Sequence, residues 1–123
     1  MAVHEGSCHC GAVKIRIDLD VSHLVICDCS ICMKKGIVHV PVPEEAFELV
    51  AGEDQLSLYQ FKTNTAKHWF CKQCGIHTFG RPRAAPERYT VNARCLDDFE
   101  AISAAVETRR FDGKNHIKDR ASA

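Results

Sequence analysis

Cys71-Lys72-Gln73-Cys74-Gly75 is the stretch of sequence that decides the fold, together with Cys8-His9-Cys10-Gly11 near the start of the chain. A structural zinc ion prefers four thiolates arranged as a tetrahedron, and each of these stretches supplies one closely spaced pair of cysteines. The glycine that ends each stretch suits a tight turn, in which the backbone takes a positive φ and directs its N–H groups toward sulfur. We predict one structural zinc ion that joins distant parts of the chain, bound by Cys8, Cys10, Cys71 and Cys74.

A third cluster, Cys27-Asp28-Cys29-Ser30-Ile31-Cys32, places three cysteines within six positions and has no obvious fourth protein ligand. Three protein ligands and one open position are typical of a catalytic zinc, because the open position receives a substrate atom. The sequence therefore predicts a second zinc site with Cys27, Cys29 and Cys32 as its ligands. The two sites together predict two Zn²⁺ ions per chain and use seven of the eight cysteines.

The eighth cysteine, Cys95, leaves other interpretations open. It is most simply a buried small apolar residue, but Cys95 or a histidine could also close the second site as a fourth ligand. Cys95 could equally act as a resolving thiol beside the three-cysteine cluster. A disulfide framework is disfavoured, because bridging cysteines one residue apart is strained. A redox role for the cluster is a further alternative, because clustered thiols of low pKa perform exchange chemistry.

Length and charge limit the classes of function. A chain of 123 residues suits one domain, which we place at 1–123 with a loose tail over about 112–123. Lysine and arginine together number 16, as do aspartate and glutamate, so no net charge draws the protein to nucleic acid or to an anionic membrane. The sequence shows neither a secretory leader pattern nor an apolar run of membrane-spanning length. We therefore expect a cytoplasmic protein, because reduced thiols in that compartment more often bind metal than form disulfides.

Short runs of alternating apolar and polar residues predict a mainly β domain. Strands are expected at residues 13–18, 24–27, 38–42, 47–51, 56–61, 68–71 and 88–93. Pro41 and Pro43 predict that the third of these is an edge strand or an extended loop, since proline cannot donate to a sheet ladder. Helix signals are weak: Ser30 could cap a single turn through Lys34, and a second turn is expected at 96–99.

These motifs resemble the glutathione-dependent formaldehyde-activating enzyme family, which also includes centromere protein V. The three cysteine clusters, in this order, are the specific part of the resemblance. The similar segments cover nearly the whole chain, at 6–13, 27–32, 65–68, 70–75, 91–97 and 111–113.

The resemblance implies an Mss4-like fold, a small β-sheet domain organised around zinc, in which the four-cysteine ion is structural and the three-cysteine ion is catalytic. It also implies an activity, the reversible addition of glutathione to formaldehyde, which gives S-hydroxymethylglutathione and is classed as a carbon–sulfur lyase reaction. The expected partner is then a small-molecule thiol such as glutathione. An open zinc suits this chemistry, because it can lower the pKa of a thiol or polarise an aldehyde oxygen. The alternatives are a non-catalytic zinc-binding interaction module and a thiol redox protein.

Several side chains are candidates to contact a substrate. His77 follows the last cysteine pair closely and is the histidine that we expect to face the open site. Lys35 comes soon after the three-cysteine cluster and could offset its negative charge or attract an anionic substrate. Arg94 could bind a carboxylate of glutathione through a bidentate contact. A carboxylate of glutathione could also be bound by Arg81, Arg83 or Arg88, or these three arginines could simply lie on a solvated surface.

Overall fold

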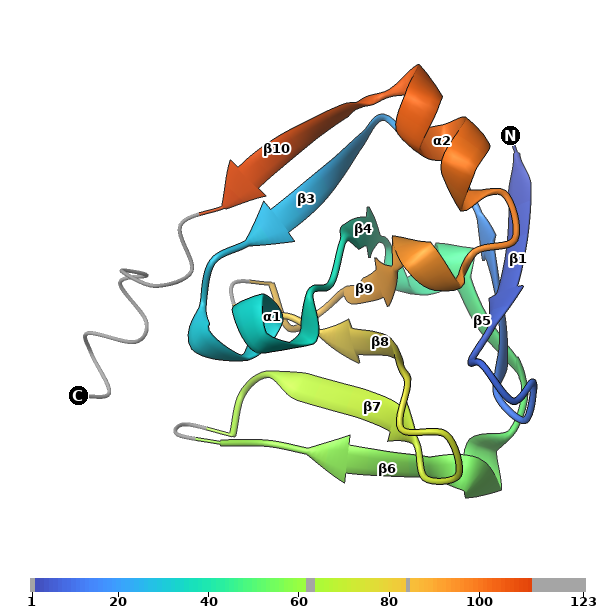
Figure 1. Ribbon diagram of the computed structural model, residues 1–123, viewed down its shortest axis with the longest axis vertical. Helices are drawn as coiled ribbons and strands as arrows, with labels where there is room; N and C mark the ends of the chain where they lie inside the picture. The colour runs from blue at the N-terminus through green and yellow to red at the C-terminus, as the bar shows by residue number, and fades with distance from the viewer. Residues whose placement is uncertain (1, 62–63, 84, 112–123) are drawn as a thin grey trace.

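The computed structural model describes residues 2–61, 64–83 and 85–111. This part of the chain forms two β-sheets that pack against each other, together with two short α-helices (Figure 1). The architecture confirms the prediction of a small, mainly β domain.

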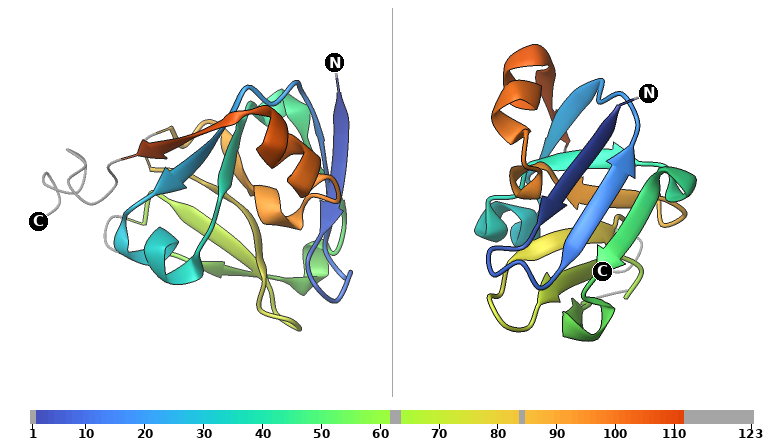
Figure 2. Two further views of the ribbon diagram at one scale, coloured as in Figure 1. Left: turned by 45° about the horizontal axis from the view of Figure 1, so that its top comes forward. Right: turned by 90° about the vertical axis from the view of Figure 1, so that its right-hand side faces the viewer.

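The smaller sheet is antiparallel and contains β1 (Val3–Ser7), β2 (Lys14–Asp18) and β5 (Phe47–Ala51), in the order β1-β2-β5. The right panel of Figure 2 shows this sheet on one side of the molecule. In β2, Ile15 and Ile17 are buried whereas the residues that alternate with them are not. This alternation is typical of a strand with one face on the core.

The larger sheet has seven strands in the order β10-β3-β4-β9-β8-β7-β6. Its strands are β3 (His23–Cys27), β4 (His39–Val42), β6 (Leu56–Tyr59), β7 (Lys67–Cys71), β8 (His77–Arg81), β9 (Tyr89–Asn92) and β10 (Glu107–Phe111). Neighbouring strands are antiparallel except β10 and β3, which run parallel. Strands β3, β8 and β10 all end on one side of the molecule, the left in Figure 1.

Two α-helices and three single turns of 3-10 helix connect the strands: α1 (Ser30–Lys35), α2 (Phe99–Ala105), η1 (Glu44–Ala46), η2 (Glu53–Gln55) and η3 (Ala93–Cys95). The N-cap of α1 is Cys29, and Ser30 is its first helical residue. The prediction that Ser30 caps this helix is therefore wrong. A cysteine of the three-cysteine cluster occupies the cap position, and the helix begins one residue after it.

The hydrophobic core lies between the two sheets. Strand β2 contributes Ile15 and Ile17, and β4 contributes Val40 and Val42, all at most 1% exposed. Successive side chains of a strand point to opposite faces of its sheet. The residues that alternate with Val40 and Val42 therefore point to the other face of the larger sheet, which is the face that carries the candidate site.

All seven predicted strands are present, with ends within two residues of the predicted ones. Three strands were not predicted, namely β1, β8 and β10. The turn expected at 96–99 was also misplaced, because the helix α2 begins at Phe99 and continues to Ala105. The predicted loose tail at 112–123 lies outside the described residues.

Pro41 is the clearest discrepancy between prediction and structure. Strand β4 is third in the larger sheet, so the prediction of an edge strand or loop is wrong. However, β4 pairs with β3 at one position only, Val25 with His39, whereas Pro41 pairs with Thr90 of β9. A proline is accommodated there because no ladder hydrogen bond toward β3 is needed at that position.

No helix in the described ranges is both long enough and apolar enough to cross a membrane.

Candidate functional site

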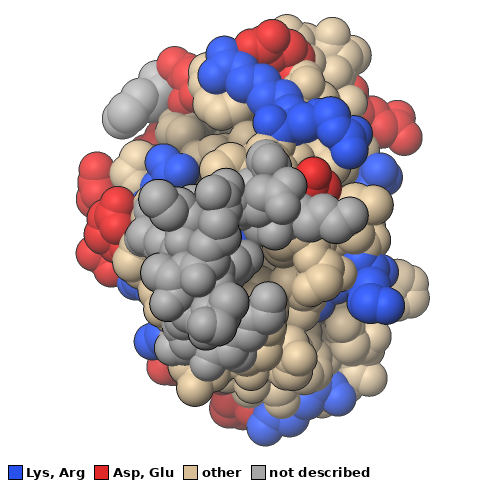
Figure 3. Space-filling model, turned by 90° about the vertical axis from the view of Figure 1, so that its left-hand side faces the viewer, with Lys and Arg blue, Asp and Glu red and all other residues tan. Residues whose placement is uncertain are grey.

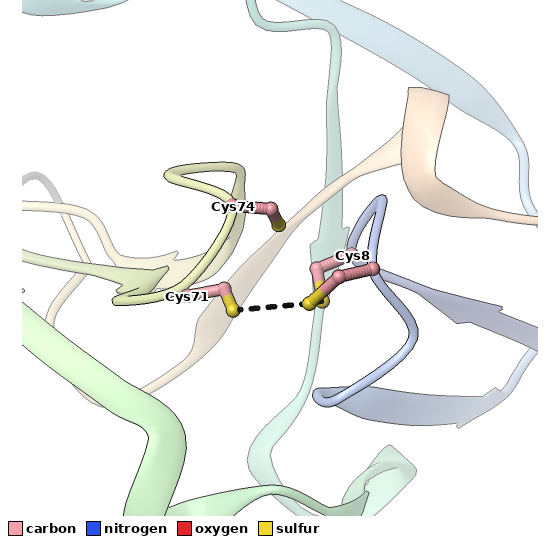
Figure 4. A group of neighbouring side chains, drawn as sticks. Cys8, Cys71 and Cys74 are labelled. Carbon is pink, nitrogen blue, oxygen red and sulfur yellow. Dashed lines mark hydrogen bonds between the residues drawn. The ribbon is translucent and has the colours of Figure 1, made fainter.

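The four-cysteine group has the geometry of a zinc site. The sulfurs of Cys8, Cys10, Cys71 and Cys74 lie within 4.8 Å of one another and could hold a metal ion. The sulfur of Cys10 is 3.7 Å from that of Cys8 and 3.6 Å from that of Cys71. A tetrahedral zinc with Zn–S distances of about 2.3 Å places its sulfurs about 3.8 Å apart, so the observed spacing fits zinc. Figure 4 shows the sulfurs of Cys8, Cys71 and Cys74 close together at the meeting of two turns.

The two cysteine pairs come from different sheets. One pair lies in the turn between β1 and β2 of the smaller sheet, and the other lies at the turn between β7 and β8 of the larger sheet. Gly11 and Gly75 follow the pairs with φ of 81° and 78°, as the sequence predicts. A metal ion bound here would join the two sheets.

Backbone amides and burial also suit this group for metal binding. The backbone N–H of Val13 donates to the sulfur of Cys8 at 3.3 Å, and both residues lie in a small buried apolar cluster. Burial opposes ionisation of Cys74, but backbone hydrogen bonds from Cys10 and Ile76 lower the pKa of its thiol to about 6. Four sulfur donors with backbone amide partners, of which Cys8 and Cys71 are buried, suit a structural zinc.

The three-cysteine group lies where β3 leads into α1. Cys27 ends β3, Cys29 precedes α1 and Cys32 lies within it, and their sulfurs fall within 4.8 Å of one another. Within the part of the chain that the structure describes, no histidine, aspartate, glutamate or further cysteine joins this group at that distance. The group could therefore hold a metal ion through three thiolates, which matches the ligand count of an open zinc site.

Hydrogen bonds among the three thiols separate their pKa values. The side chains of Cys27 and Cys32 lower the pKa of Cys29, and a hydrogen bond from Arg83 lowers it further. The same network, with Cys27 as its largest contributor, raises the pKa of Cys32. Cys29 is thus the first of the three to ionise. A bound cation would favour the thiolate form of all three, and this also suits a metal site.

A cavity of about 370 Å³ adjoins the three-cysteine group, and all three cysteines line it. Three of its lining residues, Pro41, Thr90 and His68, belong to a row that crosses four strands of the larger sheet, in which Pro41 pairs with Thr90, Thr90 with Gly80, and Gly80 with His68. Cross-strand partners share one face of a sheet, and this face is the one opposite the core. The volume lies within the range of small-molecule binding sites.

The cavity is lined by cations. Its lysine and arginine side chains are Lys67, Arg81, Arg83, Arg88, Arg109 and Arg110. No aspartate or glutamate lines it among residues 2–61, 64–83 and 85–111. Arg81 is paired with Glu44 and Arg109 with Glu107, each at 2.6 Å. Figure 3 shows several lysine and arginine side chains on this side of the molecule. The lining therefore favours an anionic ligand.

His39 connects the three-cysteine group to the sheet. Its Nε2 is 3.3 Å from the sulfur of Cys32, and its Nδ1 is 2.9 Å from the hydroxyl oxygen of Thr90. Burial lowers the pKa of His39 to about 4, so the ring is neutral and only one nitrogen carries a hydrogen. If the Thr90 hydroxyl donates to Nδ1, then Nε2 can donate to Cys32. Such a partner orients a thiolate that binds metal.

Two of the sequence candidates, Lys35 and His77, meet in the structure. The Nζ of Lys35 is 3.0 Å from Nδ1 of His77. Burial lowers the pKa of His77 to about 2 and moves the pKa of Lys35 below its ordinary value. His77 and His68 both line the cavity, and their ring centroids are 5.9 Å apart.

Arg94 is the sequence candidate that the structure places elsewhere. Its guanidinium group lies over the ring of Phe99, 5.3 Å from the ring centroid. Arg94 does not line the cavity, so this geometry gives no support to the expected substrate contact, which stays a prediction. Its position in η3 directs it toward α2 rather than toward the cavity.

Cys95 belongs to neither cysteine group. Its sulfur donates to the backbone carbonyl of His77 at 3.7 Å. Burial raises the pKa of Cys95 to about 12, and the charges of Cys8 and Cys74 act in the same direction. Cys95 is therefore a protonated thiol on the four-cysteine side, not a fourth ligand of the three-cysteine group. All eight cysteines are free thiols in this structure, so the disulfide alternative finds no support.

Sequence reasoning missed the roles of His39, His68 and β10. One available signal was the alternation in β4, because Val40 and Val42 on the core face place His39 on the opposite face. No local signal indicates that β10 pairs with β3, since a parallel partner is joined through distant chain.

Comparison with known proteins points to one family. Residues 3–111 match the family described as glutathione-dependent formaldehyde-activating enzyme. A protein of Penicillium rubens, provisionally given that name, is 37% identical over 81 residues, which are 60% of this chain and 41% of that protein. A protein of Emericella nidulans with the same provisional name is 36% identical over 80 residues, which are 60% of this chain and 40% of that protein. The chain therefore spans about two fifths of the length of these relatives.

A solved structure shares the fold. The crystal structure of a Rhodobacter sphaeroides protein superposes with a TM-score of 0.77 and 38% sequence identity. The match covers 85% of this chain and 98% of that one.

Proposed function

Because the chain belongs to the glutathione-dependent formaldehyde-activating enzyme family, we propose that it is a zinc-dependent enzyme that adds a thiol to an aldehyde. The proposed reaction joins the sulfur of glutathione to the carbon of formaldehyde and gives S-hydroxymethylglutathione. It is reversible and is a carbon–sulfur lyase reaction in the breakdown direction. The observation that carries the proposal is the three-cysteine group beside a cavity lined by cations.

The proposed step is balanced without an oxidant or a reductant. The sulfur–carbon bond forms as the π bond of the carbonyl breaks, and the electron pair moves to the oxygen. That oxygen takes up a proton equivalent to the one that the thiol releases. A zinc ion held by Cys27, Cys29 and Cys32 would supply a Lewis acid for this chemistry, able to lower the pKa of a thiol or to polarise a carbonyl.

The residues of the chain bind and orient the reactants in this proposal. Glutathione carries two carboxylates, and arginine binds carboxylates through two parallel hydrogen bonds. Arg83, Arg88 and Arg110 line the cavity and are the arginines that we assign to this role. Lys35 lies close enough to Cys32 for their charges to interact, so it would offset part of the negative charge of the thiolates.

Exchange spectroscopy by NMR tests the proposal. We expect the zinc-loaded protein to accelerate the exchange between free glutathione and S-hydroxymethylglutathione in a solution that contains formaldehyde. Cys29→Ser should abolish the acceleration, because it removes a ligand of the proposed catalytic zinc. Cys95→Ala is the matched cysteine control and should retain the acceleration, because Cys95 lies outside both groups.

One outcome would contradict the proposal. If the wild-type chain binds two zinc ions but leaves the exchange rate at its uncatalysed value, this reaction is not the function of this chain. The non-catalytic zinc module would then be the better interpretation.

A further inference from the structure

The cavity contains a buried polar group with an unused hydrogen bond. Nε2 of His77 has no hydrogen-bond partner among the described residues, and His77 is only 6% exposed. A buried polar group without a partner is costly and therefore uncommon in native structures. Because His77 lines the cavity beside the three-cysteine group, a ligand is a reasonable partner for this nitrogen.

Lys35 determines which nitrogen of His77 carries the hydrogen. Its Nζ is 3.0 Å from Nδ1 of His77, close enough for the Lys35 ammonium group to donate a hydrogen bond to that nitrogen. An ammonium group has donors and no acceptor, so Nδ1 must accept. The neutral ring then carries its hydrogen on Nε2. The unpartnered nitrogen is therefore a hydrogen-bond donor held in one orientation.

The ring of His77 lies close to Gly80 of the same strand. A Cβ atom added to Gly80 would lie 3.4 Å from Cε1 of His77, the atom between the two ring nitrogens. Gly80 pairs with Thr90 and with His68, whose side chains both line the cavity. The ring of His77 is thus held beside a row of residues of which His68 and Thr90, like His77 itself, line the cavity.

We propose that His77, oriented by Lys35, donates a hydrogen bond from Nε2 to an oxygen of the bound substrate. The inference rests on the proposed function, under which this oxygen belongs to the aldehyde and gains the electron pair as the sulfur–carbon bond forms. A donor that is fixed before the reaction stabilises the developing charge on that oxygen without reorganisation. It also positions the carbonyl carbon for attack by the thiol.

Histidine labelled with ¹⁵N tests this donor by NMR in the zinc-loaded protein. We expect the spectrum to place the hydrogen of His77 on Nε2. We also expect this signal to shift when glutathione and formaldehyde are added together, because they form S-hydroxymethylglutathione in solution. The matched ligand is S-methylglutathione, which lacks the hydroxyl oxygen and should leave the signal unchanged. Hydrogen on Nδ1, or the same response to both ligands, would overturn the inference.

Two lysine variants test the orienting contact. Lys35→Met removes the donor to Nδ1, so we expect the hydrogen of His77 to distribute between both nitrogens. Lys35→Arg retains a cationic donor and should keep the hydrogen on Nε2. If Lys35→Met leaves the tautomer of His77 unchanged, Lys35 does not orient the ring and the inference is wrong.

His77→Phe tests the consequence for the reaction. We expect kcat/KM for formaldehyde to fall by roughly 100-fold, as for the loss of one donor to a developing oxyanion. The KM for glutathione should stay unchanged, which a general loss of structure would not produce. A His77→Phe variant that folds, binds two zinc ions and has wild-type kinetics would refute the inference. If this variant does not fold, the two Lys35 variants and the ligand-induced shift of the His77 signal test the inference instead. Failure of the proposed function is distinguishable, because the wild-type chain itself would then give no acceleration.

Discussion

The eight cysteines occupy three different environments at the scale of single residues. Cys71 is fully buried in an apolar cluster at the turn between β7 and β8, where it meets the cysteine pair of the other sheet. Cys29 lies at the cavity and receives a hydrogen bond from Arg83. Cys95 contacts only a backbone carbonyl among the hydrogen bonds found in the described residues. The same substitution should therefore have a different effect at each position.

Serine at Cys71 and serine at Cys29 should separate a structural site from a functional one. Structural zinc contributes about 10 kcal/mol or more, comparable to the whole stability of a small domain, so we expect Cys71→Ser to lose folding or solubility. Cys29→Ser should fold, bind one zinc ion fewer and lose activity. Zinc analysis and circular dichroism melting curves measure both results. Equal unfolding of the two variants would mean that both sites are structural.

Replacing Cys95 by alanine should change little. Its single weak hydrogen bond predicts a loss of about 1 kcal/mol or less in the free energy of unfolding, with both metal ions retained. Urea titration and zinc analysis check these two quantities. A missing zinc ion in Cys95→Ala would show that Cys95 is a ligand after all.

At the scale of elements, alternation explains both the success and the limits of sequence prediction. A strand with one face on the core, such as β2, buries every second residue, and the sequence predicts strands of this kind. Strand β10 has no buried residue, so periodicity gives no signal for it. Strand β8 is buried at four consecutive positions and does not alternate. These strands are defined by their neighbours in the sheet and not by their own pattern of residues.

Strand β9 should influence metal binding through a contact that it makes with β4. His39→Phe removes the partner of Cys32, and Thr90→Val removes the partner of His39. We expect either change to weaken zinc binding at the three-cysteine group by about 10- to 100-fold. Thr90→Ser keeps the hydroxyl and is the matched control. Competition with a chromophoric chelator measures the affinity, and an unchanged affinity in His39→Phe would rule out the orienting role.

For the whole molecule, the cysteine spacing predicted both groups of cysteines that could hold a metal ion, because close spacing of cysteines is a local property of the chain. The cavity beside the three-cysteine group is a non-local property. It is formed where β3 and β4 pair at a single position and where β10 lies parallel to β3. Its cationic lining comes from β7, β8, β10 and the segment between β8 and β9. Sequence reasoning could name Lys35 and His77, but it could not place them in contact or place Arg94 outside the cavity lining.

The buried histidines should make the folded protein sensitive to acid. Burial lowers the pKa of His39 and His68 to about 4 and that of His77 to about 2, whereas an unfolded histidine has a pKa of about 6.5. The unfolded chain therefore binds more protons below pH 6.5, and the free energy of unfolding falls as the pH drops from about 6.5 to 4. Urea titrations between pH 7 and 4.5 measure this slope. We expect His68→Phe to make the dependence of the free energy of unfolding on pH less steep. An unchanged slope in this variant would contradict the assignment of the acid sensitivity to His68.

The turn between β7 and β8 carries two cysteines of the four-cysteine group and leads, two residues after Gly75, into His77 of the cavity. A metal ion bound by this group would therefore influence the position of His77 without touching its side chain. A newly synthesised chain would then have to bind this ion before the cavity takes its final shape, which would give maturation a fixed order in time. Under zinc starvation, incompletely folded chains would then accumulate. Stepwise return of zinc to chelated protein should restore secondary structure first and exchange activity second.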